Sequence, residues 1–194
     1  VRINDNPMLR DVIFPPRPLG AAGVEIQRNP RLAELSMLLK CSPFWYTIAD
    51  SPDLQRLPVS VREPASQFSL LCTDDRTQSY SIVGVPSLRD LTELPRATVL
   101  AQLDIRGNTG LIGLDGLEEL GHVLELVVDG NPKLESLAGL DPAMGGGLRI
   151  VETVFAVLNN VTLDQCDVDI LAESLLAQNT ELTLDVEGNG GGCQ

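Results

Sequence analysis

Aromatic side chains are scarce in this chain: Phe, Trp and Tyr make up 4% of its 194 residues. Large rings therefore cannot fill a core, and the abundant Leu, Val and Ile must fill it in layers, a composition typical of repeat proteins. Histidine is nearly absent as well, since His122 is the only one. Catalysis by a Cys-His or Ser-His pair would have to use it, and we interpret it as a packed or solvated side chain in "EELGHVLEL" instead.

Basic side chains are also few, with 14 Lys and Arg against 27 Asp and Glu, which gives a net charge of -13. A chain of this sign is a poor partner for phosphate backbones, so we expect no nucleic-acid ligand. No apolar run reaches the roughly 18 residues that a transmembrane helix needs. Paired carboxylates could serve glycoside hydrolysis in so acidic a chain, but nothing singles out one pair. We predict no catalytic residue.

Metal-binding motifs are missing too. The four cysteines, Cys41, Cys72, Cys166 and Cys193, form no C-x-x-C motif, and there is no histidine cluster, so we predict neither a metal site nor a cofactor. On their own these cysteines admit three disulfide pairings. The glycine tail "EGNGGGC" lacks the Lys-Ser/Thr of a phosphate loop. "NNVT" makes Asn160 a glycosylation sequon, which has meaning only in a eukaryotic secretory context.

What the sequence does contain is a repeat, present in eight copies. Its common pattern is apolar-x-[Val/Ile]-x-x-Asn-Pro-x-Leu-x-x-Leu, and both apolar positions before the Asn are filled in every copy. Most copies are 22 or 23 residues apart, and periods in the low twenties are typical of solenoids. The residues at the Asn position, which we call the anchors, are expected at Asn6, Asn29, Ser51, Val85, Asn108, Asn131, Thr153 and Asn189.

Each copy is interpreted as one coil of the solenoid. The apolar-x-[Val/Ile] alternation turns two side chains inward from a short strand, and the strands of successive coils stack in parallel. The anchor amide bonds backbone groups at the corner, and the two Leu positions fill the return side. Asp129-Gly130 by itself predicts a hairpin, but its recurrence predicts a corner instead. The next parallel strand is then expected near 148–150.

Two intervals between anchors are longer. Residues 58–79 are interpreted either as an irregular loop or as an additional abbreviated coil. Residues 164–194 are interpreted as a helical cap, because Val168, Leu171 and Leu175, with Ile170 as a further candidate, recur at helical spacing behind an acidic start. Such a cap would cover the last apolar layer of the solenoid.

Outward-facing residues of the strands are expected to form two columns along the solenoid. Their mixed charges favour an ordinary solvated face, and Trp45 is the best single contact candidate, followed by Arg106, Asp129 and Arg149. The first column is expected to contain Arg2, Glu25, Thr47, Ser81, Asp104, Val127, Arg149 and Asp185. The second is expected to contain Asn4, Gln27, Ala49, Val83, Arg106, Asp129, Val151 and Glu187.

The phrases "GNPKLESLAGL", "GNTGLIGLDGLEEL" and "RNPRL" place Leu three residues after the Asn, usually with Pro between. This pattern resembles the receptor L domain family, a leucine-rich-repeat-like single-stranded right-handed β-helix, and above all its bacterial secreted or surface members. The resemblance is clear over residues 101–194 and weaker over 1–100. Copies three, four and seven depart from it because they lack the Asn. No ligand-binding residue of the family can be matched here.

The resemblance has several implications. It implies a disulfide between Cys166 and Cys193, which leaves Cys41 and Cys72 either paired or as two free buried thiols. It implies one solenoid domain over 1–194, mostly β although α/β by content, that begins inside a repeat, with a possible lipid anchor upstream of Val1. We expect a non-enzymatic extracellular or cell-surface module that binds a protein or glycan. The alternative is a purely structural segment of a larger surface protein.

Overall fold

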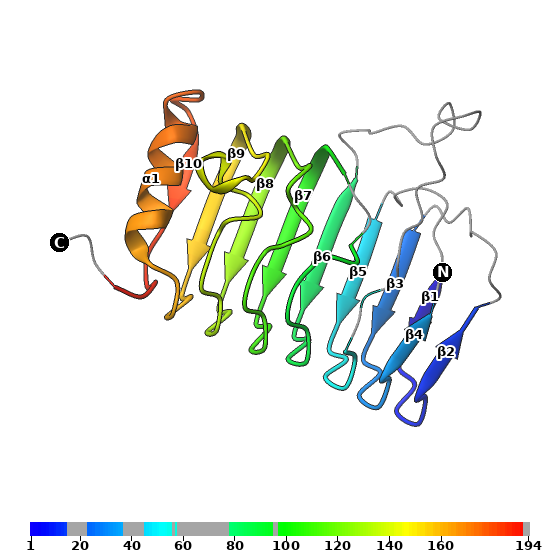
Figure 1. Ribbon diagram of the computed structural model, residues 1–194. Coiled ribbons are helices and arrows are strands. Elements are labelled where there is room, and N and C mark those ends of the chain that lie inside the picture. The colour runs from blue at the N-terminus through cyan, green and yellow to red at the C-terminus, as the bar shows by residue number, and fades with distance from the viewer. Residues whose placement is uncertain (15–22, 37–44, 56, 58–77, 95–96, 192–194) are drawn as a thin grey trace.

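The computed structural model describes residues 1–14, 23–36, 45–55, 57, 78–94 and 97–191. They form a mostly β structure in which every strand pairing is parallel (Figure 1). The strands of the large sheet, in spatial order, are β1 (Arg2–Asn4), β3 (Gly23–Gln27), β5 (Trp45–Ala49), β6 (Ser79–Val83), β7 (Val99–Arg106), β8 (His122–Asp129), β9 (Ile150–Leu158) and β10 (Thr183–Asp185). The strands β2 (Asp11–Ile13) and β4 (Glu34–Ser36) form a second, two-stranded sheet.

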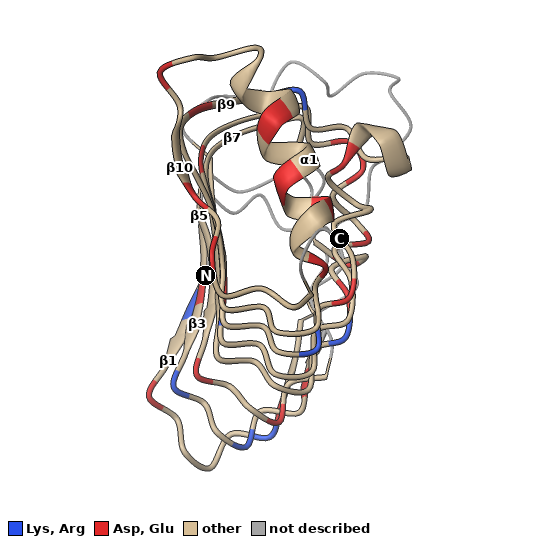
Figure 2. Ribbon diagram, turned by 90° about the vertical axis from the view of Figure 1, so that its left-hand side faces the viewer, with Lys and Arg blue, Asp and Glu red and all other residues tan. Residues whose placement is uncertain are grey.

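This arrangement is consistent with a parallel-strand solenoid. Figure 2 looks along the stack and shows the sheet on one side and the returning chain on the other. We call the segment from one strand of the large sheet to the next a coil. Because β8 is parallel to both β7 and β9, Asp129-Gly130 is a corner and not a hairpin turn.

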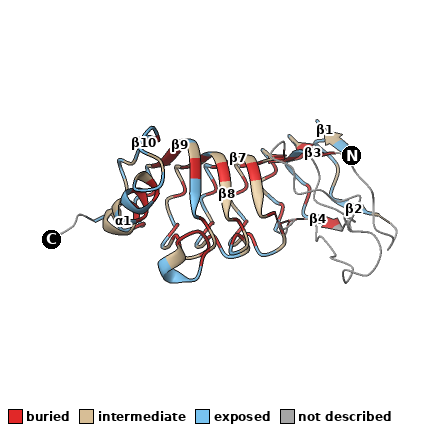
Figure 3. Ribbon diagram, turned by 90° about the horizontal axis from the view of Figure 1, so that it is seen from above, coloured by how far each residue is buried: buried red, intermediate tan, exposed pale blue. Residues whose placement is uncertain are grey.

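The core lies between the large sheet and the returning chain, as the colouring by burial in Figure 3 shows. Alternate residues of each strand point into it, and in every strand from β3 to β9 these inward side chains are buried. Buried leucines on the return side complete each layer. The first of them lies three residues after the anchor and is held there by a hydrogen bond from its N–H to the anchor carbonyl. The inward pairs of β3 to β9 are Val24 and Ile26, Tyr46 and Ile48, Tyr80 and Ile82, Leu103 and Ile105, Leu126 and Val128, and Phe155 and Val157.

Each corner requires a left-handed backbone at the residue before the anchor. Four coils place glycine there, as at Gly130 with φ 64°, and glycine adopts this conformation without steric cost. The other four use Asp5, Arg28, Asp50 and Asn159, whose φ values lie between 49° and 59°. Asn and Asp tolerate this region better than other side chains do, so Arg28 is the least suited of the four.

Asparagine side chains stack along these corners as a ladder. The Nδ2 of Asn131 donates to the carbonyl of Ile105 at 3.0 Å, and its Oδ1 accepts from the Asn108 N–H at 3.0 Å. Asn29, Asn108 and Asn160 make the corresponding bonds and, like Asn131, are fully buried. Asn6 and Asn189 lie at the same corner in the first and last of these coils.

The seventh anchor is Asn160, so the prediction of Thr153 was wrong. In the register of β8 and β9, Leu126 lies opposite Phe155 and Val128 opposite Val157. The next parallel strand, β9, begins at Ile150, as predicted, but the residues of β9 that lie beside the end of β8 are 156–158. The error arose because β9 is nine residues long and contains two apolar alternations, of which the first resembles the repeat. A register irregularity between Val123 and Glu125 accommodates the extra length.

A helix covers the C-terminal end of the core. The helix α1 (Gln165–Leu176) begins after Asp164, whose carboxylate accepts from the Cys166 N–H. It buries Val168, Leu171 and Leu175, as predicted, together with Ala172. Ile170 is 59% exposed, so its tentative inclusion in the buried face was wrong; it lies two residues after Val168, on another side of the helix. β10 follows the helix and pairs with β9.

The other long interval falls mostly outside the described residues, which omit 58–77. Ser79 belongs to β6, and Gln78 just before it is buried. β5 and β6 are direct neighbours, with Tyr46 opposite Tyr80, so no further strand lies between them in the sheet. Pro142–Met144 forms a single 3-10 turn on the return side of the coil that begins with β8.

Candidate binding surfaces

The outward face of the large sheet has three columns of side chains, since the strand pairings add one that the sequence pattern had not predicted. The added column contains Gly23, Trp45, Ser79, Gln102, Glu125, Val154 and Thr183. The other two agree with the predicted columns except at β9. There Ala156 and Leu158 take the places predicted for Arg149 and Val151.

β5 and β6 present an outward face without charge, which we call the neutral strip: Trp45, Thr47, Ala49, Ser79, Ser81 and Val83. Trp45 is 46% exposed, the largest exposed side chain of the strip. Its indole lies over Gly23 of β3, where an added Cβ would come within 1.9 Å of the ring. Gly23 thus leaves room for the ring on the sheet, and one face of the ring is directed to solvent.

β7 and β8 carry charged side chains on this face, and some of them already form hydrogen bonds within the chain. Arg106 donates from Nε to Asp104 at 2.5 Å, and Asp129 accepts from the Asn159 amide at 2.9 Å. Arg106 and Asp129 are opposite each other in register. Of the four predicted contact residues, the structure therefore places Trp45, Arg106 and Asp129 on this face. Arg149 is exposed but precedes β9, outside the columns.

The first strands are joined by ion pairs. Arg28 bonds both carboxylate oxygens of Asp5, and this hydrogen bonding, aided by the charge of Arg28, lowers the pKa of Asp5. Glu25 accepts from the amide of Asn4, which is the main reason that its pKa is lowered, and it also pairs with Arg2 at 2.8 Å. The charges at this end of the face thus bind β1 to β3 and are less available to a ligand.

The outward face of β9 is apolar, which the sequence reasoning missed. Val154, Ala156 and Leu158 form it, next to Val127 of β8. They were missed because the seventh copy was aligned seven residues too early. The phrase "FAVLNNV", which repeats "LVVDGNP" more closely than "LRIVETV" does, was the signal that could have found them.

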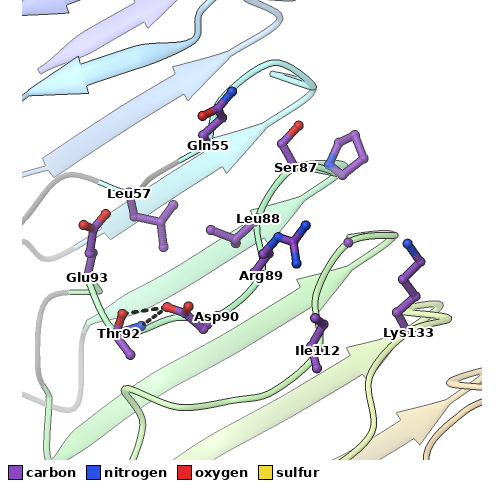
Figure 4. A pocket seen from close by; sticks show the side chains of 12 residues that line it. Gln55, Leu57, Ser87, Leu88, Arg89, Asp90, Thr92, Glu93, Ile112 and Lys133 are labelled. Carbon is purple, nitrogen blue, oxygen red and sulfur yellow. Dashed lines mark hydrogen bonds between the residues drawn. The ribbon is translucent and has the colours of Figure 1, made fainter.

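A second candidate surface is a hollow of about 790 Å³ on the return side of the coils that begin with β5 to β8 (Figure 4). Polar and charged side chains of both signs line it, together with the exposed Ile112. Gly110 also lines it; an added Cβ there would come within 2.0 Å of the Pro86 carbonyl oxygen, so the coil can carry no side chain at this point. The other lining residues are Gln55, Leu57, Pro86, Ser87, Leu88, Arg89, Asp90, Thr92, Glu93 and Lys133.

His122 begins β8, and its ring is largely covered. Its Nε2 lies 2.6 Å from Oε1 of Glu152, although the direction of the contact is not that of a good hydrogen bond. The arrangement is one of a packed histidine held beside a carboxylate. Within the described ranges, no three His, Cys, Asp or Glu side chains are grouped so that they could hold a metal ion.

Two covalent features predicted from the sequence can be located. Cys166 on α1 is disulfide-bonded. Cys41, Cys72 and Cys193 lie outside the described residues, so the Cys166 to Cys193 and Cys41 to Cys72 pairings stay predictions. Asn160 of the sequon is fully buried, and its Nδ2 donates to the Val128 carbonyl at 3.0 Å. Glycosylation of the folded chain at Asn160 would replace one of the two hydrogens that Nδ2 donates, to Val128 and to Asn189, and would place a sugar in the buried corner, so it is incompatible with the ladder.

Comparison of the chain with known proteins finds no matching family model, no matching curated protein and no matching solved structure. Among the described residues, no helix is long and apolar enough to cross a membrane.

Proposed function

We propose that this chain is a non-enzymatic recognition module whose outward sheet face binds a protein or glycan partner. The observation that carries the proposal is the neutral strip with its half-exposed Trp45. Tryptophan is among the commonest anchors of binding surfaces, and side chains with strong hydration shells are absent from the strip around it. Val154 and Leu158 of β9, which are partly exposed, lie on the same side of the molecule and extend the area over which a partner could make contact, whereas Ala156 between them is buried.

The finer description of the fold belongs to the same proposal. We propose a right-handed, leucine-rich-repeat-like β-helix of the receptor L domain type, secreted or displayed on a cell surface. The repeat phrases and the parallel register support the fold. The disulfide at Cys166 supports the location, because disulfides persist chiefly in oxidising compartments.

The experiment uses the fact that the chain has one tryptophan, so its fluorescence reports on Trp45 alone. The full chain is screened against arrays of neutral oligosaccharides and of secreted proteins, and each partner found is titrated while tryptophan emission is followed. We expect a saturable change in emission. Trp45→Ala is expected to weaken binding at least tenfold, whereas Trp45→Phe, which keeps a ring over Gly23, is expected to weaken it less.

Two further variants separate a surface effect from a folding effect. Ser81→Arg adds a charge to the strip at a partly exposed position and should also weaken binding at least tenfold, whereas Glu125→Gln, on the same face but outside the strip, should leave it intact. Circular dichroism checks that each variant is folded. Binding that survives both Trp45→Ala and Ser81→Arg would contradict the proposal. It would favour a structural role, which the repeated asparagine corner also suits.

A further inference from the structure

Beyond the sheet face, the structure assigns a second binding site to the hollow on the return side, and we propose that its ligand is a carboxylate-bearing sugar of the uronate type. The hollow lies on the other side of the core from the neutral strip. Its volume of about 790 Å³ is in the range of small-molecule sites and accommodates one or two sugar rings.

Two cations without an ion-pair partner, Arg89 and Lys133, line the same hollow; Arg10, Arg31 and Arg149 also lack such a partner among the described residues, but they do not line the hollow. Arg2, Arg28 and Arg106 each pair with a carboxylate, but in the part of the chain that the structure describes neither Arg89 nor Lys133 does. Both side chains are exposed. An unpaired guanidinium and ammonium at one hollow favour a carboxylate, which arginine can bind through two parallel hydrogen bonds.

The backbone explains why the two cations have room for a ligand between them. Arg89, Ile112 and Glu135 occupy corresponding positions in successive coils, because the Ile112 N–H donates to Arg89 and the Glu135 N–H donates to Ile112. Arg89 and Lys133 therefore belong to the coils on either side of the one that carries Ile112, as Figure 4 shows. That middle coil has Gly110 at the position that Ser87 and Lys133 fill in its neighbours, so no side chain stands between the cations.

The remaining lining matches the hydroxyl groups of a sugar. Asp90 accepts hydrogen bonds from the N–H and hydroxyl of Thr92 through one oxygen, Oδ1, at 3.1 and 2.6 Å. Its second carboxylate oxygen makes none of these bonds and can accept from a ligand hydroxyl. Gln55 adds an amide at the opposite rim. The carboxylates of Asp90 and Glu93 would repel a ligand with several negative charges, so a short uronate fits better than a sulfated or phosphorylated polymer.

The test measures binding of galacturonate, a single sugar ring with one carboxylate, to the full chain by calorimetry, with its methyl ester as the uncharged control. We expect the acid to bind and the ester to bind at least tenfold more weakly. Arg89→Gln and Lys133→Gln should each weaken binding of the acid about tenfold, since one hydrogen bond to a charged group is worth roughly that factor. Arg149→Gln, which removes an exposed arginine elsewhere, should change nothing, and Trp45→Ala should leave this binding intact.

Equal binding of acid and ester, no binding of either, or full binding by Arg89→Gln and Lys133→Gln together would overturn the proposal. Loss of binding in Trp45→Ala with retention in the other two would place the sugar on the sheet face instead and would also overturn it. A short peptide with a free carboxyl terminus is tested in parallel. If it alone binds, with the same dependence on Arg89 and Lys133, the site is real but the assigned ligand class is wrong.

Discussion

The corner of the last four coils and the corner of the middle coils are built from different side chains. Asn108, Asn131, Asn160 and Asn189 form an uninterrupted ladder, whereas Ser51 and Val85 occupy the same position in the middle of the sheet. The bonds in the ladder run in one direction. Each asparagine accepts from the anchor of the preceding coil and donates to a carbonyl of that coil, so it stabilises chiefly the preceding corner; Asn131 also donates to the Asp129 carbonyl of its own coil, at the longer distance of 3.3 Å.

This direction explains how the middle coils manage without asparagine. Val85 still donates its N–H to Oδ1 of Asn108, so its corner is served by the next coil. Val85 has no side-chain oxygen that could accept from the Ser51 N–H. The Ser51 hydroxyl donates to the Ala49 carbonyl of its own coil at 3.2 Å. Where a coil lacks the asparagine, the anchor N–H of the preceding coil therefore loses its side-chain acceptor. The following variants test this.

The largest effect is expected from Asn131→Val, which puts the residue of the middle corner into the ladder. It removes the acceptor of the Asn108 N–H and the donor of the Ile105 carbonyl, both of them buried. Each buried group left without a partner costs about 1 to 3 kcal/mol, so we expect a loss of about 3 kcal/mol in the free energy of unfolding. Urea denaturation measures it. Asn6→Val is the control, because Asn6 is exposed and serves no described coil before it. Equal losses would refute the directional ladder.

A smaller loss is expected from Gly130→Ala, which tests the left-handed residue of the same corner. An added Cβ at Gly130 meets nothing closer than the Gly107 nitrogen at 4.0 Å, so the cost comes from the backbone conformation alone. That cost is about 1 to 2 kcal/mol. Asp50→Gly in the middle coils is the reverse change and should raise stability by less than about 1 kcal/mol. If the urea midpoints of both variants are unchanged, the left-handed backbone before the anchor does not affect the stability of the corner.

How far the sequence could predict the fold depended on how regular each copy is. The corner at Asp129-Gly130 and the buried face of α1 followed from the pattern, because each depends on local chemistry that recurs. Thr153 was chosen over Asn160 because β9 contains two alternations, and only pairing with β8 distinguishes them. The hollow could not be foreseen, because it results from Gly110 lying between the coils of Arg89 and Lys133. Such a juxtaposition depends on the stacking of coils and not on any one of them.

Val85→Asn should extend the ladder into the middle coils at little net cost. The new amide could accept from the Ser51 N–H and donate to the Ile48 carbonyl, by analogy with Asn108, and each such bond contributes about 1 kcal/mol. Loss of a buried Val side chain offsets this by about 1.5 kcal/mol. We therefore expect a change below about 1 kcal/mol in urea denaturation, far less than for Asn131→Val. A loss of similar size in both would show that position 85 is adapted to an apolar side chain.

The smallest effect concerns the rings that distinguish the middle coils, Tyr46 and Tyr80, whose centroids are 5.6 Å apart. The Tyr46 hydroxyl is buried and has no hydrogen-bond partner among the described residues, which costs free energy, so Tyr46→Phe should leave stability unchanged or raise it by up to about 1 kcal/mol. Burial also raises the pKa of Tyr46 well above its ordinary value of 10. The unfolded chain thus ionises first, and wild-type stability should fall as the pH rises above 10. Between pH 9 and pH 11, the free energy of unfolding measured in urea should fall less for Tyr46→Phe than for the wild type. An equal fall in both proteins would contradict the raised pKa of Tyr46.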